Sequence, residues 1–141
     1  MQRTLVLLKE RNHYFGKFKT INESELIRLS GGDFSNIDVF YKTRENILNM
    51  VAHLEDMIEK RLNSNETEDD VTVEMKSILV ETLKEKDRLI KTILAQDLEI
   101  LDYIEKEKNK IIIDLKTLTT GRKALSAYQH STPLHRLDEE L

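Results

Sequence analysis

Apolar residues near the start of the chain recur at helical intervals and not in the alternating pattern of strands. Over residues 3–29 they are separated by three, seven, three, eight and three positions, which places them on one face of a helix. They are Leu5, Leu8, Phe15, Phe18, Leu26 and Leu29. The sequence "SGGD" follows at 30–33, and glycine tolerates the left-handed backbone that often ends a helix. We therefore predict a first helix that ends at this glycine pair.

A second helix is predicted within residues 33–62. Ser35 followed three positions later by Asp38 approximates a capping box, with Asp in place of Glu or Gln. Arg44 falls on the apolar stripe, where its stem can lie along apolar surface while its head reaches water. The polar sequence "NSNETEDD" at 63–70 indicates a solvated loop. The stripe consists of Ile37, Phe40, Ile47, Val51, Leu54, Ile58 and Leu62.

The third segment, roughly 70–119, contains neither Gly nor Pro. At 1.5 Å per residue it would form a helix of about 75 Å, a length typical of coiled coils and elongated bundles. Asp97 and Lys108 fall on its apolar stripe, where polar residues commonly fix register or partner number at some cost in stability. The stripe consists of Leu79, Leu83, Ile90, Leu94, Leu101, Ile104, Ile111, Leu115 and Leu118.

These elements predict an all-α fold, an elongated antiparallel bundle or coiled coil. It contains one very long helix and a short C-terminal helical segment. The short connection at 30–33 favours an antiparallel pair of first and second helices that covers part of the third. The remainder of the third helix would need its own C-terminal end or another protein to cover it. We expect one bundle domain over 1–128 and a flexible tail over 129–141.

Composition supports this fold and narrows the classes of function. Charged residues make up 34% and aromatic residues 6%, with no Trp and one Pro, which is typical of long helices. The net charge is +1 up to residue 62 and −5 beyond it. Neither part is basic enough to neutralise a phosphate backbone, so we do not expect nucleic-acid binding. The N-terminal apolar run is too short for a signal peptide or a membrane span. We therefore expect a cytoplasmic protein without a membrane span.

Catalytic and metal-binding patterns are absent from the sequence. The chain has no cysteine, which removes disulfides, thiolate nucleophiles and zinc–sulfur sites. His13 and His53 are isolated on predicted helices, so a structural role is favoured over a metal site. The glycines of "LSGGDFS" lack the lysine and spacing of a phosphate-binding loop. We expect no enzyme activity, no cofactor and no metal.

Two segments carry a resemblance to a known family. They are "GGDFSNIDVFYKTRENILNMV" at 31–51 and "LEILDYIEKEKNKIIIDLKTLTTGRKALSAY" at 98–128. The chain resembles the small flagellar export chaperones of the FliT class and, more loosely, those of the FlgN class. The resemblance implies a cytoplasmic helical chaperone that holds a segment of an axial flagellar protein, either the filament cap or a hook–filament junction protein.

In that family the C-terminal helix region governs access to the partner. The matching positions here are Arg122, Lys123, Ala124, Leu125 and Tyr128. To these positions we add apolar residues of the third helix that the first two helices would leave uncovered. Together they form the candidate partner-binding set. These are Ile104, Ile111, Leu115 and Leu118.

The stretch "TGRKALSAYQ" at 120–129 permits two interpretations. Leu125 and Tyr128 pack on the first or second helix, with Gly121 bending the chain, or they form a docking element for a partner. The first is favoured. Alternatives to the chaperone are a structural coiled coil that buries its seam in a homo-oligomer, such as a homodimer, and a helical regulator acting by protein contact.

Overall fold

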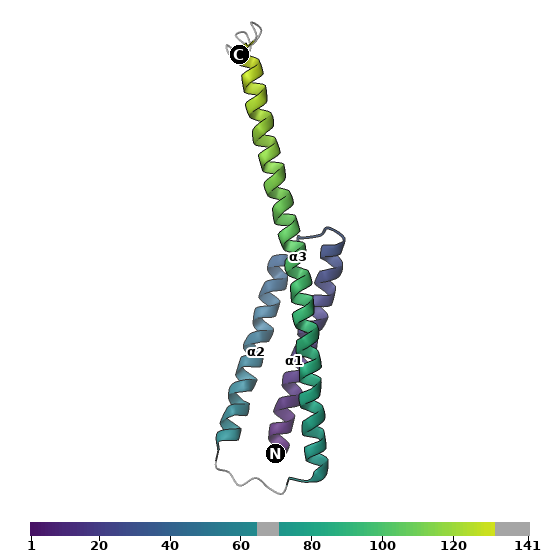
Figure 1. Cartoon of the computed structure of the whole chain (residues 1–141). Helices are drawn as coiled ribbons and strands as arrows, with labels where there is room; N and C mark the ends of the chain where they lie inside the picture. The colour runs from purple at the N-terminus through teal and green to yellow at the C-terminus, as the bar shows by residue number, and fades with distance from the viewer. Residues whose placement is uncertain (65–70, 132–141) are drawn as a thin grey trace. The chain divides into compact units, whose positions relative to one another are not determined.

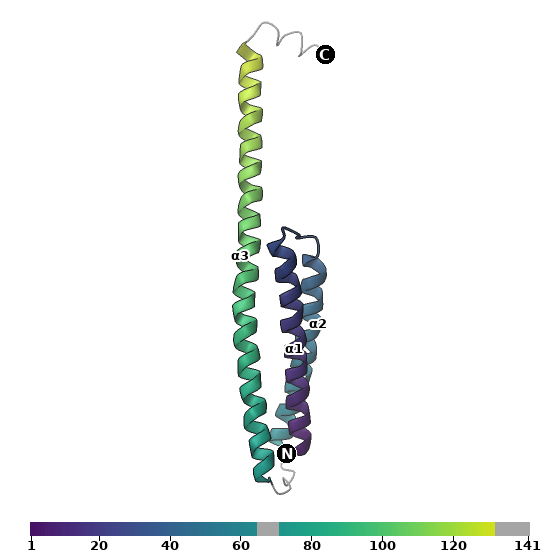
Figure 2. The same ribbon diagram turned by 90° about the vertical axis from the view of Figure 1, so that its right-hand side faces the viewer.

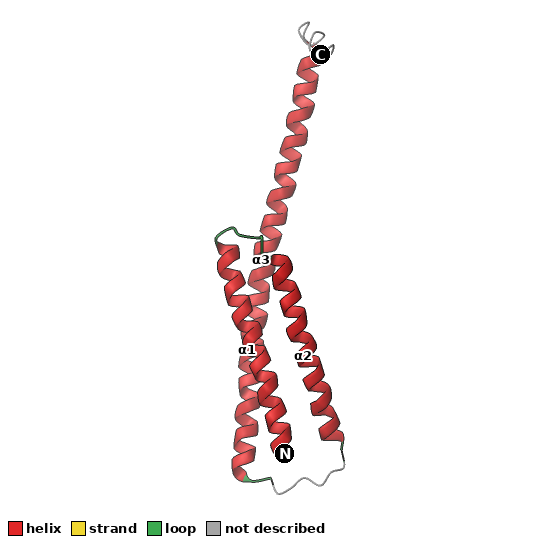
Figure 3. Ribbon diagram, turned by 180° about the vertical axis from the view of Figure 1, so that it is seen from behind, coloured by secondary structure: helices red, strands yellow, loops and turns green. Residues whose placement is uncertain are grey.

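A computed structural model of the chain describes residues 1–64 and 71–131, except for the side chains of residues 130 and 131. It contains the helices α1 (Gln2–Ser30), α2 (Ile37–Asn63) and α3 (Val73–Ser131). The described residues contain no strand, and short turns account for nearly everything outside the helices (Figure 3). The prediction of an all-α chain is therefore confirmed.

The chain divides into two compact units, Met1–Leu101 and Asp102–Leu141. The boundary falls within α3, inside the range expected to be one domain. In the first unit α1, α2 and the beginning of α3 lie side by side and alternate in direction (Figures 1 and 2). In the second unit α3 continues to Ser131, so residues 129–131 are helical where the tail was expected to begin. The rest of the expected tail, 132–141, lies outside the described residues.

A glycine motif ends α1 as the sequence predicts. Gly32 has a φ of 81°, a conformation that glycine adopts without the steric cost other residues have. Its N–H donates to the carbonyl of Leu29 at 3.0 Å, and the N–H of Asp33 donates to the carbonyl of Arg28 at 2.9 Å. This pair of bonds is a Schellman motif. It satisfies two carbonyl groups at the end of α1 and turns the chain toward α2.

The start of α2 differs from the predicted capping box. The N-cap residue is Asn36, and no side chain caps the helix. Ser35 instead donates its N–H to the carboxylate of Asp33 at 2.9 Å, so it belongs to the turn. The hydrogen bond from the Ser35 hydroxyl, followed by this backbone bond, lowers the pKa of Asp33. The turn therefore competes successfully for the groups that a capping box would use.

The core of the first unit consists of two apolar clusters. One draws on all three helices and contains Phe15, Phe18, Ile47, Val51, Leu89 and Ile93. The other contains Leu7, Leu8, Leu54 and Ile58. These residues include most of the predicted α1 and α2 stripes, which are confirmed apart from three positions. Leu26 and Ile37 are half-buried and Leu62 is exposed.

The buried face of α3 is one residue out of phase with the predicted stripe. Leu83, Leu94 and Leu101 are exposed, and the inward positions are spaced by seven, four, three and four residues. Two of those inward positions are polar, so the buried positions are less apolar in the sequence than the predicted stripe. Their polar groups are satisfied, as burial requires, since Thr82 donates to the carbonyl of Ile78 and Gln96 to that of Lys19. The buried set is Thr82, Leu89, Ile93, Gln96 and Ile100.

Candidate functional site

The predicted partner-binding residues all lie on α3, in the second unit. The stretch 120–128 was expected to be a separate short segment, but it continues α3 without interruption. Gly121 therefore does not bend the chain as expected. A glycine inside a helix costs about 1 kcal/mol relative to alanine, which the surrounding helix formers offset. No neighbouring atom lies within 4 Å of the position a Cβ would occupy there.

Most of the apolar candidates are well exposed. Ile104 is half-buried, whereas Ile111, Leu115, Leu118 and Leu125 have exposed fractions between 50% and 57%. Tyr128 is 67% exposed. The expectation that Leu125 and Tyr128 are packed is therefore wrong. Their exposure favours the other interpretation, in which they form part of a docking element.

The spacing of these residues places them on one face of the helix. Ile104, Ile111, Leu118 and Leu125 recur at intervals of seven residues, and Leu115 lies four positions after Ile111. Residues at these intervals share a face of an α-helix. We call the surface formed by these five residues the apolar face. Sequence reasoning missed its flanking residue Ile112, although the three-residue step to Leu115 indicates it.

Charge is distributed unevenly along this helix. Residues 102–107 contain three acidic residues and one lysine, whereas residues 116–123 contain three basic residues and no acidic one. Lys106 pairs with Asp102 at 2.8 Å, and this hydrogen bond raises the pKa of Lys106. Lys108 and Arg122 interrupt the apolar face itself. The face thus has an acidic end and a basic end.

A polar cluster in the first unit contains the other predicted seam residue. Asp97 accepts a hydrogen bond from Arg44 at 3.0 Å and one from Asn22 at 3.2 Å. The side chain of Arg44 is only 15% exposed, so it reaches water less than expected. It lies against aromatic rings instead. Asp97 therefore fixes register between helices of one chain, whereas Lys108 is exposed.

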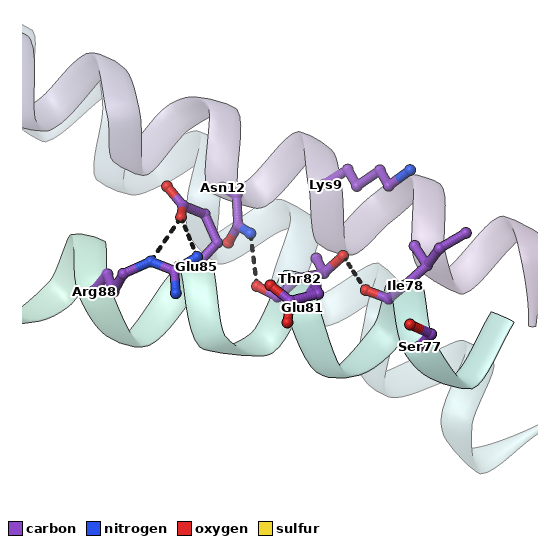
Figure 4. A pocket seen from close by; sticks show the side chains of 8 residues that line it. All are labelled: Lys9, Asn12, Ser77, Ile78, Glu81, Thr82, Glu85 and Arg88. Atoms are coloured by element: carbon purple, nitrogen blue, oxygen red, sulfur yellow. Dashed lines mark hydrogen bonds and ion pairs between the residues drawn. The ribbon is translucent and has the colours of Figure 1, made fainter. Parts of the chain in front are cut away.

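A shallow hollow of about 440 Å³ lies between α1 and α3 (Figure 4). From α1, Asn12 donates to the backbone carbonyl of Thr82 at 2.8 Å. From α3, Arg88 pairs with Glu85 at 2.7 Å. Each of these two interactions stays within the helices, and the buried amide oxygen of Asn12 has no hydrogen-bond partner in the part of the chain that the structure describes. Among the described residues, no group of three or more His, Asp or Glu side chains is placed to hold a metal ion.

Comparison of the chain with known protein families, with curated proteins and with solved structures finds no match. Within residues 1–64 and 71–131, none of the helices is long and apolar enough to cross a membrane.

Proposed function

We propose that this protein binds an amphipathic helix of another protein along the apolar face. The observation that carries the proposal is the exposure of four large aliphatic side chains, Ile111, Leu115, Leu118 and Leu125, on one helix face. Contiguous exposed apolar surface of this kind marks interaction sites. An amphipathic helix that meets such a face uses anchors spaced by three, four and seven residues.

The class of protein we propose is a cytoplasmic flagellar export chaperone. Support comes from the resemblance of residues 31–51 and 98–128 to the FliT class. The second of these segments contains the whole apolar face. The proposed client is the filament cap protein or a hook–filament junction protein, held by a helical segment that would otherwise expose apolar surface before export.

The charges on α3 suggest how a client helix would be oriented. Arg122 and Lys123 follow Leu118 by one turn, so they favour a client with acidic residues beside its apolar anchors. Opposite charges contribute mainly to orientation and association rate, whereas burial of Leu115 and Leu118 supplies affinity.

Light scattering on a sizing column tests the proposal. The full chain is run alone and then mixed with the C-terminal region of the flagellar cap protein from the same genome. A complex of defined stoichiometry supports the proposal. If neither the cap protein nor the hook–junction proteins change the mass of the chain, the flagellar assignment is wrong.

A matched pair of variants locates the binding surface. Leu115→Glu with Leu118→Glu should abolish the complex, because two charges would replace the centre of the apolar face. Ile27→Glu is the control, since Ile27 is 73% exposed on α1 in the first unit. Equal loss of binding in both variants would place the client elsewhere.

A further inference from the structure

In the second unit, apolar residues recur at every seventh position from Ile104 to Leu125. Binding of a single client helix does not require so regular a repeat. Ile104, Ile111, Leu118 and Leu125 occupy one position of a heptad, and Lys108, Leu115 and Arg122 occupy the other seam position. A heptad repeated in this way is the pattern of a helix that pairs with a similar helix. We propose that a second copy of this chain covers most of the apolar face, in an antiparallel two-stranded coiled coil over residues 104–122.

The polar seam residues decide the direction of the pair. In a parallel pair Lys108 would face Lys108 and Arg122 would face Arg122, so two seam layers would bring like charges together. In an antiparallel pair each of these residues faces an aliphatic residue of the other copy, along which its stem can lie.

The uneven charge along the helix favours the same direction. An antiparallel pair places the acidic residues 102–107 of each copy beside the basic residues 116–123 of the other. A parallel pair places acidic beside acidic and basic beside basic. Charge complementarity of this kind sets partner orientation in coiled coils.

One register satisfies both the seam and the charges. Ile111 of each copy faces Leu115 of the other, which puts two aliphatic layers at the centre. Arg122 then faces Ile104 of the second copy, one residue from Glu105. Residues 104–122 of the two copies then lie opposite one another over about 28 Å of helix, and Leu125 of each copy lies opposite Leu101 of the other, the last residue of its first unit.

The dimer and the proposed client use the same face, so each excludes the other. Only this competition rests on the proposed function. The dimer itself is measured without any client, so it can fail while the client still binds, and the client can fail while the dimer forms.

Sedimentation equilibrium of the full chain between about 1 and 200 µM tests self-association. We expect a dimer that dissociates on dilution. Ile111→Glu with Leu118→Glu should give a monomer at all of these concentrations. Ile113→Glu is the control, because Ile113 is 61% exposed on the side of the helix opposite the seam. A monomeric native chain, or equal loss of the dimer in the control, overturns the proposal.

Charge reversal tests the direction. Arg122→Glu with Lys123→Glu should weaken the antiparallel dimer by about fivefold or more, because the new acidic residues would then lie about one helical turn or less from Glu105 and Glu107 of the other copy. Adding Glu105→Lys and Glu107→Lys to the same chain should restore the affinity. A parallel dimer would show neither effect, since like residues face each other before and after reversal.

A spin-label distance gives a second measure of direction. The chain has no cysteine, so Ser126→Cys provides a single site for a nitroxide label. The proposed register places the two labels about 40 Å apart, whereas a parallel pair places them within about 20 Å. The short distance would overturn the antiparallel arrangement.

Discussion

The guanidinium group of Arg44 on α2 donates a hydrogen bond to the carboxylate of Asp97 on α3 at 3.0 Å. The same group lies 4.5 Å from the ring centre of Phe18 on α1. One side chain thus contacts the other two helices of the first unit. A shift of any helix by one residue would break the ion pair or the ring contact, so this arrangement fixes the register of the bundle.

Removing the charge of Asp97 should destabilise the bundle. Asp97→Asn leaves the largely buried Arg44 without its ionic partner, and we expect a loss of about 1–3 kcal/mol in the free energy of unfolding. Arg44→Met should cost less, because Asp97 is 29% exposed and keeps its bond from Asn22. Urea unfolding of both variants and of the double variant measures the coupling.

An exposed ion pair in the same unit is the control for this experiment. Glu85 and Arg88 pair at 2.7 Å with more than 45% of each side chain exposed. Glu85→Ala should therefore cost less than about 0.5 kcal/mol. A similar loss for Glu85→Ala and Asp97→Asn would contradict a register role for the buried pair.

The glycine pair between α1 and α2 allows a comparison of adjacent positions. Gly32 has a φ of 81°, so Gly32→Ala should lower the free energy of unfolding by about 1 kcal/mol or more. Gly31 has a φ of −88° and room for a Cβ in ordinary contact. Gly31→Ala should be neutral or slightly stabilising. Thermal unfolding distinguishes the two variants. A larger loss of stability in Gly31→Ala than in Gly32→Ala would contradict the left-handed conformation of Gly32.

The sequence sufficed to predict the first two helices and the turn between them. Along α1 and α2 the stripe is strongly apolar, as in the run from Phe40 to Ile58, and the glycine pair marks the turn. In α3 the buried positions lie one residue before the predicted stripe, and the predicted stripe is the more apolar of the two sets. Burial of Gln96 depends on its bonds to Asn22 and to the carbonyl of Lys19, which no periodicity shows.

The candidate site was predictable only in part, for a different physical reason. Beyond Tyr103, the heptad positions that are buried earlier in α3 are occupied by charged residues, Glu107, Lys110 and Asp114. Only one set of heptad positions is therefore apolar in this part of the helix. For that reason the spacing was enough to identify Ile104 and Ile111. Spacing does not say what covers a face. The sequence therefore favoured packing of Leu125, whereas the structure leaves it exposed.

Titration of Asp33 should show the hydrogen bonds of the turn. The hydroxyl and N–H of Ser35 lower the pKa of this carboxyl group. Their contribution to stability is present above the unfolded-state pKa and is lost as the pH falls through the lower, folded-state value. Ser35→Ala should raise the pKa of Asp33 toward its usual value, as measured by NMR. An unchanged pKa would exclude the hydroxyl as the main cause.

Two glycines inside helices offer a route to greater stability. Gly16 in α1 and Gly121 in α3 both have open space at the Cβ position. Gly16→Ala should raise the free energy of unfolding of the first unit by about 0.5–1 kcal/mol. Gly121→Ala should raise helical content in circular dichroism, while the unfolding transition of the first unit stays in place. A shift of that transition by Gly121→Ala would show that the two units unfold together.

The end of the apolar face separates a docking role from a structural one. Leu125→Glu with Tyr128→Ala changes two exposed side chains, so helical content and the cooperative thermal transition should stay nearly unchanged. Affinity for a helical partner should fall, because the change removes an apolar anchor and adds a charge beside Arg122. Circular dichroism and titration with the cap-protein region measure the two effects on the same samples. Loss of the cooperative transition would instead make this segment part of the core.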